Sequence, residues 1–214
     1  MLFPELMSVS GGEFGPGFDP GKVIRTPVGS ASFIWSSCDS GEMNWVIDGD
    51  GGPRRQGRMN MDRLTDLVTP ACVDNGNPPV SPGTPPLHES SQWSGSWYDP
   101  SHSGEGYVLQ VLASEQALVY WFSYDGEGER RWFFGVGAIS GQLISFETMF
   151  TTSGALFGDA FDPEAAQVLP WGSLELELQC TSGKARFQPT EQGFPAGELD
   201  LVRLTALDGL SCPD

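Results

Sequence analysis

The sequence is poor in positive charge. Its 214 residues contain 11 Lys and Arg against 28 Asp and Glu, which gives a formal net charge of −17 at pH 7. Nucleic-acid binding depends on clustered cationic side chains that neutralise phosphates, and an anionic membrane surface would repel this chain. We therefore expect no nucleic-acid partner and interpret the charge as a solvated acidic surface.

Long apolar runs and helical periodicity are also missing. No run approaches the roughly 20 residues of a membrane-spanning helix, and no sustained i, i+3, i+4, i+7 pattern is present. The first residues lack a basic region followed by an apolar stretch, so we expect any export signal to be absent from this sequence. What is abundant is glycine (28), proline (17) and aromatic residues (11%), which together predict short strands joined by turns.

The chain divides into three segments. Residues 1–72 predict four strands, at 2–9, 30–37, 42–48 and 58–64. Residues 73–91 are rich in Pro, Gly and Ser and predict an extended linker. Residues 92–214 predict eight strands, at 93–98, 106–112, 117–124, 131–138, 143–151, 173–180, 184–188 and 198–204.

The first segment repeats the second half of the third. The stretch 10–30 matches 153–173 without a gap, 41–45 matches 183–187, and 57–65 matches 197–205. Residues 1–72 are therefore predicted to be a half-repeat equivalent to strands five to eight of a complete unit. We expect the sequence to be cut from a longer tandem array, and a genuine half-unit is the alternative. Its two strand edges would pair with another chain or with the second unit. Phe-Asp-Pro recurs in both copies, so Asp19 and Asp162 are predicted to cap a turn.

Two of the predicted strands are apolar on both faces. They carry Tyr120, Trp121, Phe122, Trp132 and Phe133. Apolar residues on both faces are typical of a strand that is buried on both sides. One face should therefore line the core. The other should pack against the amino-terminal half or a loop, or form an apolar patch for a partner.

Four cysteines sit at equivalent positions of the two copies. Three pairings are possible, and the repeat selects Cys38–Cys72 and Cys180–Cys212. Such bonds indicate an oxidising compartment. A metal site is the rival interpretation, but no Cys-x-x-Cys pair is present and we expect no metal and no cofactor.

Catalytic patterns are weak. His102 and Ser103, with nearby carboxylates, suggest a hydrolase, but no Gly-x-Ser-x-Gly turn exists and a polar loop explains the cluster more simply. The turn with Asp125, Glu127 and Glu129 could hold Ca²⁺, yet it lacks the spacing of an EF-hand. No catalytic residue is predicted.

Aromatic residues are the best binding candidates. Aromatic faces stack on sugars and flat molecules, and pockets form at barrel mouths. The residues predicted to line such a site are Trp97, Tyr107, Tyr120, Tyr124 and Trp132, with a packed core as the alternative.

Residues 95–107, with Tyr124-Asp125 and Trp132, resemble an uncharacterised repeat of secreted and surface proteins of proteobacteria. Its members carry G-x-W-Y-[DN]-P-x-x-S-G-x-G followed by Y-D-x-x-G-x-x-x-W. The resemblance covers residues 93–212 and part of 1–72, and it implies secretion but no activity. The first strand, Gly-Ser-Trp-Tyr-Asp, also resembles that of avidin-like barrels.

These observations predict an all-β protein. Residues 92–214 should form an antiparallel up-and-down eight-stranded barrel, or a flattened barrel, preceded by a four-stranded half-repeat. We expect a non-enzymatic secreted, periplasmic or cell-surface module that binds a small molecule or glycan. The alternatives are a structural spacer of a larger surface protein and a hydrolase using Ser103 and His102.

Overall fold

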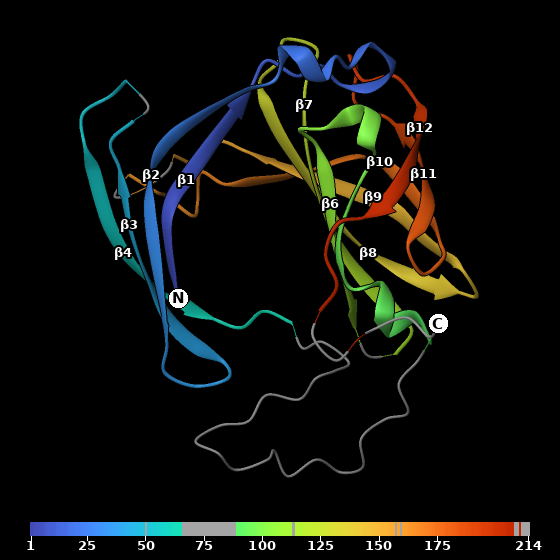
Figure 1. The fold of residues 1–214 in the computed structure, drawn as a ribbon, viewed down its shortest axis with the longest axis horizontal. Coiled ribbons are helices and arrows are strands. Elements are labelled where there is room, and N and C mark those ends of the chain that lie inside the picture. Colours follow the sequence, from blue (N-terminus) through green and yellow to red (C-terminus); the bar gives the residue numbers. More distant parts are fainter. Residues whose placement is uncertain are drawn as a thin grey trace.

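The computed structural model describes residues 1–49, 51–65, 89–112, 114–156, 158, 160–207 and 210. The fold is all-β, with a four-stranded sheet beside a closed eight-stranded barrel (Figure 1). Both are antiparallel, which confirms the predicted fold class.

The four-stranded sheet is a simple meander. Its strands are β1 (Leu2–Ser10), β2 (Ile24–Trp35), β3 (Ser40–Ile47) and β4 (Arg55–Asp62), and they are hydrogen-bonded in that order. Strands β1 and β4 are its two edges.

The barrel follows the same up-and-down pattern and closes where β12 meets β5. Val202 lies opposite Tyr98 and Arg203 opposite Trp97 at this seam. The strands are β5 (Gly95–Tyr98), β6 (Gly106–Leu112), β7 (Gln116–Tyr124), β8 (Arg130–Ser140), β9 (Leu143–Ser153), β10 (Gln167–Leu178), β11 (Ser182–Pro189) and β12 (Gly197–Arg203).

Strand registers of β1–β4 agree with those of β9–β12. Ser10 pairs with Ile24, as Ser153 pairs with Gln167. Gly29 pairs with Ile47, as Gly172 pairs with Pro189. The sheet and half of the barrel therefore match in strand order and register.

Large side chains fill the barrel. Its buried cluster contains aromatic and aliphatic residues from all eight strands. Trp171 belongs to this cluster, with its ring centroid 4.3 Å from that of Phe133 and 5.4 Å from that of Trp121. The interior is a packed core and not a pore.

The connector between β1 and β2, residues 11–23, lies across one end of the barrel (Figure 1). It contains the short 3₁₀ helices η1 (Gly15–Gly17) and η2 (Pro20–Lys22). Asp19 caps η2, since its carboxylate accepts from the Gly21 amide at 2.9 Å. Asp162 accepts from the Glu164 amide at the same distance in the second copy. Both aspartates thus have the predicted capping role.

Phe14 inserts from this connector into the barrel core. Its side chain is buried, and its ring lies between 4.9 and 6.2 Å from five core rings, which are Trp121, Phe133, Trp171, Phe187 and Phe194. A side chain of the first copy thus completes the core of the second.

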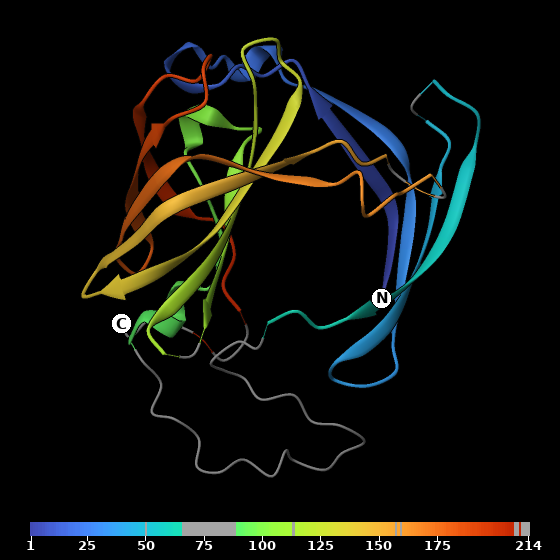
Figure 2. The ribbon, with the colours of Figure 1, turned by 180° about the vertical axis from the view of Figure 1, so that it is seen from behind.

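The equivalent hairpin of the second copy reaches in the opposite direction. The outer ends of β9 and β10 leave the barrel and extend toward the four-stranded sheet (Figure 2). A Cβ at Gly158 would lie 3.5 Å from the Trp45 ring of β3. Trp45 is the counterpart of Phe187, which Phe14 contacts in the barrel, so each copy sends its connector onto the other.

Most of the predicted linker, residues 73–88, lies outside the described residues. Its end belongs to the 3₁₀ helix η3 (Glu89–Trp93), which precedes β5. A further 3₁₀ helix, η4 (Pro100–His102), follows β5.

Candidate functional site

Three of the five predicted binding aromatics are buried inside the protein. Trp97 and Tyr107 are each 1% exposed and belong to the barrel core, and Tyr124 is 2% exposed beneath Gly12 of the connector. The Trp97 indole N–H donates to the Trp93 carbonyl at 2.9 Å. Trp97 and Tyr107 are packed in the core and give no support to a ligand site at the barrel mouth, whereas Tyr124 is among the residues that line a cleft beside β1.

The other two lie on the outer face of the barrel. Tyr120 is opposite Phe134 and Phe122 is opposite Trp132 on adjacent strands, so all four side chains share that face. The Trp132 ring stacks with Phe134 at 5.2 Å and with Tyr120 at 6.1 Å. We name this set of four residues the aromatic wall. It explains why β7 and β8 are apolar on both faces.

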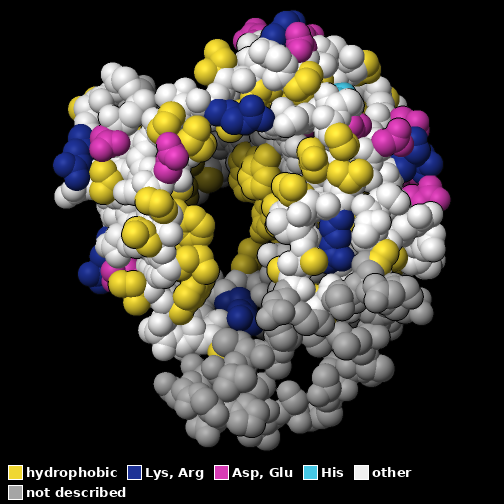
Figure 3. All heavy atoms as spheres, viewed as in Figure 1, with side chains coloured by type: hydrophobic (Ala, Val, Ile, Leu, Met, Phe, Trp, Pro, Cys, Tyr) yellow, Lys and Arg dark blue, Asp and Glu magenta, His cyan; other side chains and the backbone are white. Residues whose placement is uncertain are grey.

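The wall borders a cleft between the barrel and β1. The cleft has a volume of about 510 Å³. Figure 3 shows a hollow between the sheet and the barrel with hydrophobic side chains on both sides of it. We call the cleft of about 510 Å³ the β1 cleft. It is lined by Met7, Ser8, Val9, Phe122, Arg130 and Trp132 among others. Phe122 is 51% exposed and Trp132 37% exposed, so part of each side chain is accessible.

Two arginines flank the β1 cleft. The Arg130 guanidinium donates to the Ser8 hydroxyl at 2.7 Å and so links the barrel to β1. Arg131 pairs with Glu191 at 2.9 Å and lies over the Phe194 ring at 5.1 Å. No carboxylate of the described residues pairs with Arg130, so it brings a positive charge to a cleft in a strongly acidic protein.

A buried carboxylate lies under the polar loop after β5. Glu105 is 7% exposed and bridges two partners, the His102 ring nitrogen Nδ1 at 2.7 Å and the Ser123 hydroxyl at 2.5 Å. Phe18 of the connector stacks on the His102 ring at 4.7 Å, nearly parallel. The hydrogen bond to Glu105 raises the pKa of His102, and the charge of Asp99 adds to this against the opposing effect of burial.

This geometry gives no support to the hydrolase alternative. His102 is bonded to Glu105, and the Ser103 hydroxyl lies 3.5 Å from the Arg25 guanidinium. A nucleophilic serine needs its hydroxyl within hydrogen-bond reach of the base. The carboxylate is instead the centre of this cluster, which holds the connector against the barrel.

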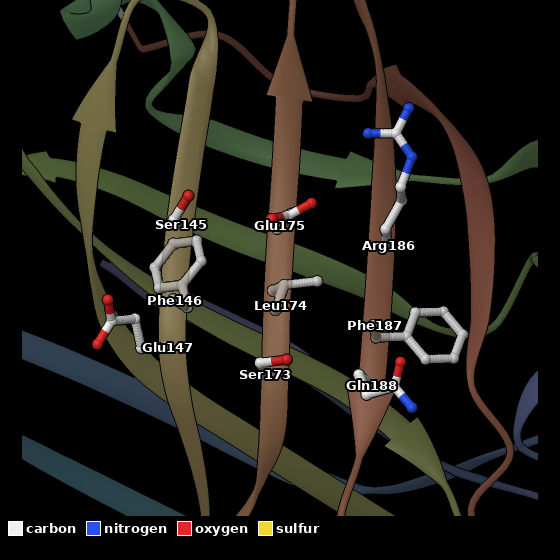
Figure 4. A pocket seen from close by; sticks show the side chains of 9 residues that line it. All are labelled: Ser145, Phe146, Glu147, Ser173, Leu174, Glu175, Arg186, Phe187 and Gln188. Carbon is white, nitrogen blue, oxygen red and sulfur yellow. The ribbon is translucent and has the colours of Figure 1, made fainter.

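Shallow grooves recur on the outer surfaces of both copies. One has a volume of about 600 Å³ and crosses β9, β10 and β11 (Figure 4). Its polar lining includes Glu175, Arg186 and Gln188, above the buried side chains of Leu174 and Phe187. The other, of about 470 Å³, occupies the equivalent place on the four-stranded sheet. Because it recurs at equivalent positions, we attribute the groove to the curvature of the repeated sheet.

The acidic turn after β7 is held by one of its own side chains. The Asp125 carboxylate accepts from the amides of Glu127 and Glu129 at 2.9 and 3.0 Å. Within the described part of the chain, no cluster of three or more His, Cys, Asp or Glu residues is arranged to hold a metal. Cys72 and Cys212 lie outside the described residues, so both predicted disulfides stay predictions.

No family model matches this chain, and no curated protein does either. Among the described residues, no helix has the length and apolar character to cross a membrane.

Sequence reasoning missed several residues that shape this region. Phe14 lies in a glycine-rich stretch that is typical of a surface loop, so its burial was not predicted. The signal that could have found it is a Phe-Gly pair that recurs at the same place in both copies. Met7 and Arg130 carry no local signal, because their proximity depends on how the sheet and barrel are arranged. Phe122 was named on a strand predicted to be apolar on both faces, but it was not among the five predicted binding aromatics.

Proposed function

We propose that the protein is a non-enzymatic β-repeat module that binds a small molecule or glycan in the β1 cleft. The observation that carries this proposal is the pair of exposed aromatic side chains, Phe122 and Trp132, that line the cleft with Arg130. Concave sites with aromatic walls and few polar groups are typical of small-ligand binding.

The lining indicates the class of ligand. Aromatic faces stack on sugar rings and flat molecules, and a guanidinium presents paired donors that match a carboxylate. The ligand should therefore carry an acidic group beside a flat or apolar face. Uronate-containing glycans and small aromatic acids fit this description.

The test is a binding screen with those two ligand classes and neutral glycans. Trp132→Ala should weaken binding of any acidic ligand by about tenfold or more, since an aromatic anchor contributes above roughly 1.4 kcal/mol. Arg130→Met, which keeps the stem and removes the charge, should lower affinity for the acidic ligand selectively. Titration calorimetry measures both effects.

Phe161→Ala is the matched control, because Phe161 is 58% exposed and does not line the β1 cleft. Its affinity should equal that of the unchanged protein. Absence of binding to every probe, or equal loss in the control, would overturn the proposal. Circular dichroism checks that each variant is folded.

We further propose that the module is secreted, periplasmic or at the cell surface, with disulfides Cys38–Cys72 and Cys180–Cys212. Equivalent cysteines in the two copies support these pairings, and no free cysteine is found among the described residues. Each disulfide would stabilise the folded protein by roughly 3–4 kcal/mol in the chain-entropy model, because it restricts the unfolded chain. Non-reducing peptide mapping tests the connectivity, and any other pairing would contradict it.

A structural spacer in a larger surface protein is the second candidate. The observation favouring it is the filled barrel, whose core is completed by Phe14 from the other copy. A spacer needs rigidity and no ligand. An empty binding screen combined with high mechanical or thermal stability would favour this function.

A further inference from the structure

One apolar face of the four-stranded sheet is only partly covered: Ala31 and Trp45 on it are buried, and other large side chains on it are exposed. Register places Phe3, Trp35 and Met59 on the side that corresponds to the barrel interior. They are 41%, 57% and 44% exposed. Exposed large apolar side chains gathered on one face mark an interaction surface.

The equivalent residues of the barrel are buried. By the repeat, Phe3 corresponds to Phe146, Trp35 to Leu178 and Met59 to Leu199, which are 1%, 0% and 4% exposed. The difference arises because β5–β8 cover the same face in the barrel. The second copy thus shows what a β1–β4 sheet is shaped to receive.

The barrel strands equivalent to the two edges of the sheet are both paired with a further strand. Strand β9, the counterpart of β1, pairs with β8, and β12, the counterpart of β4, pairs with β5. Strands β1 and β4 have no such neighbour in the described structure. Unpaired edges of apolar strands are templates for further pairing.

The residues that hold β5 in the barrel have counterparts in the first copy, where Arg63 pairs with Asp39 and Thr65 donates to Gln110 instead. Arg203 donates to the Ser94 carbonyl at 2.9 Å, and the Thr205 hydroxyl accepts from the Ser96 amide at 2.9 Å. The Leu204 amide also donates to the Ser96 carbonyl. The first copy carries the same three residues, Arg-Leu-Thr, at positions 63–65.

We propose that the β1–β4 sheet binds a four-stranded antiparallel segment of the β5–β8 type and closes with it into a second barrel. One such segment satisfies both edges, the apolar face and the Arg-Leu-Thr contact at once. A small ligand would leave the edges unpaired, and a second copy of the sheet brings no counterpart of the Ser94–Ser96 backbone. The segment belongs to a further repeat unit of this kind.

The test joins a β5–β8 segment to β1 in the same way that β8 is joined to β9 in the barrel. A second copy of residues 89–143 is placed directly before Met1, because Met1 corresponds to Ile144 and the natural turn between β8 and β9 is then retained. Amide exchange in β1 and β4 should slow by about tenfold or more, since closure turns edge strands into paired ones. Binding of an apolar dye should fall, and sedimentation should show a monomer.

Two variants of the extended protein keep the test specific. Arg63→Met should restore faster exchange in β4, and the same substitution in the original chain, where Arg63 pairs with Asp39 at 3.7 Å, should have a smaller effect on β4 exchange. Two prolines in the added copy of β7 should abolish the protection, because proline cannot donate to a central ladder.

Unchanged exchange in β1 and β4 of the extended protein would overturn the proposal. A dimer of the original 214-residue chain with both edges already protected would also overturn it, because a second copy would then be the occupant. Ligand binding in the β1 cleft is measured on the original protein, and strand closure is measured on the extended one. Failure of one proposal therefore does not decide the other.

Discussion

His102 and Glu105 form a charged pair in the loop between β5 and β6, and Phe18 of the connector stacks on the His102 ring. The hydrogen bond to Glu105 raises the pKa of His102 above its ordinary value of 6.5. Since the folded state binds the proton more tightly, the pair stabilises the protein fully below pH 6.5. That stabilisation is lost as the pH rises through the raised folded-state pKa.

We predict that His102→Gln destabilises the protein more at pH 5.5 than at pH 8.5. The free energy of unfolding in urea, measured for both proteins at both pH values, gives the difference directly. Other titrating groups cancel in this comparison because both proteins contain them. An equal loss at the two pH values would show that the pair does not carry the effect.

At the residue scale, the sequence predicts what depends on neighbours along the chain. The capping of turns by Asp19 and Asp162 depends on residues two positions away, and both caps are observed. The inward side chains of Leu174 and Leu176 follow from strand alternation. The accessibility of Trp132 and the burial of Trp97 depend on which strand lies opposite, so a sequence motif cannot separate them.

Among the elements, the seam between β12 and β5 is the narrowest in the barrel. Only two residue pairs form its ladder. Arg203 reinforces it by donating to the Ser94 carbonyl at 2.9 Å and to the Thr205 carbonyl at 3.1 Å. Its guanidinium also lies over the Trp97 ring at 5.9 Å.

Arg203→Met should therefore destabilise the barrel by about 1.5–3 kcal/mol, the range for hydrogen bonds to charged groups. Amide exchange should speed up first in β5 and β12. Arg186→Met is the control, because its ion pairs with Glu177 and Glu198 are exposed and such pairs contribute about 0–1 kcal/mol. Equal losses in the two variants would contradict the role given to the seam.

The predicted strand boundaries are close to the observed ones where turns are short. They are wrong near the β-bulge between β1 and β2. Strand β2 begins at Ile24, six residues before the predicted start, because Pro27 and Gly29 read as turn residues. In the structure they lie beside the register shift between β1 and β2. A Cβ at Gly29 would meet the Val46 carbonyl, so glycine permits this close approach of the strands.

At the scale of the whole molecule, the two copies interlock. Phe14 of the first connector contacts Phe187 of β11, and the second connector brings Gly158 to Trp45 of β3. Because Phe187 and Trp45 are equivalent positions, the exchange is reciprocal. The sequence repeat predicted the similarity of the copies but not this exchange, which depends on side chains meeting across the two units.

The exchange predicts that one side chain of the first copy controls the stability of the second. Phe14→Ala should destabilise the barrel by about 3–5 kcal/mol, the usual cost of removing a buried phenyl ring from a core. Urea unfolding followed by circular dichroism measures the loss, and limited proteolysis should show faster cleavage within residues 11–23. Phe161→Ala removes an equally large but exposed ring from the other connector and should change stability by less than about 0.5 kcal/mol. If the barrel loses less than about 1 kcal/mol in Phe14→Ala, the connector only rests on a barrel that is stable without it, and the copies are not interlocked in energetic terms.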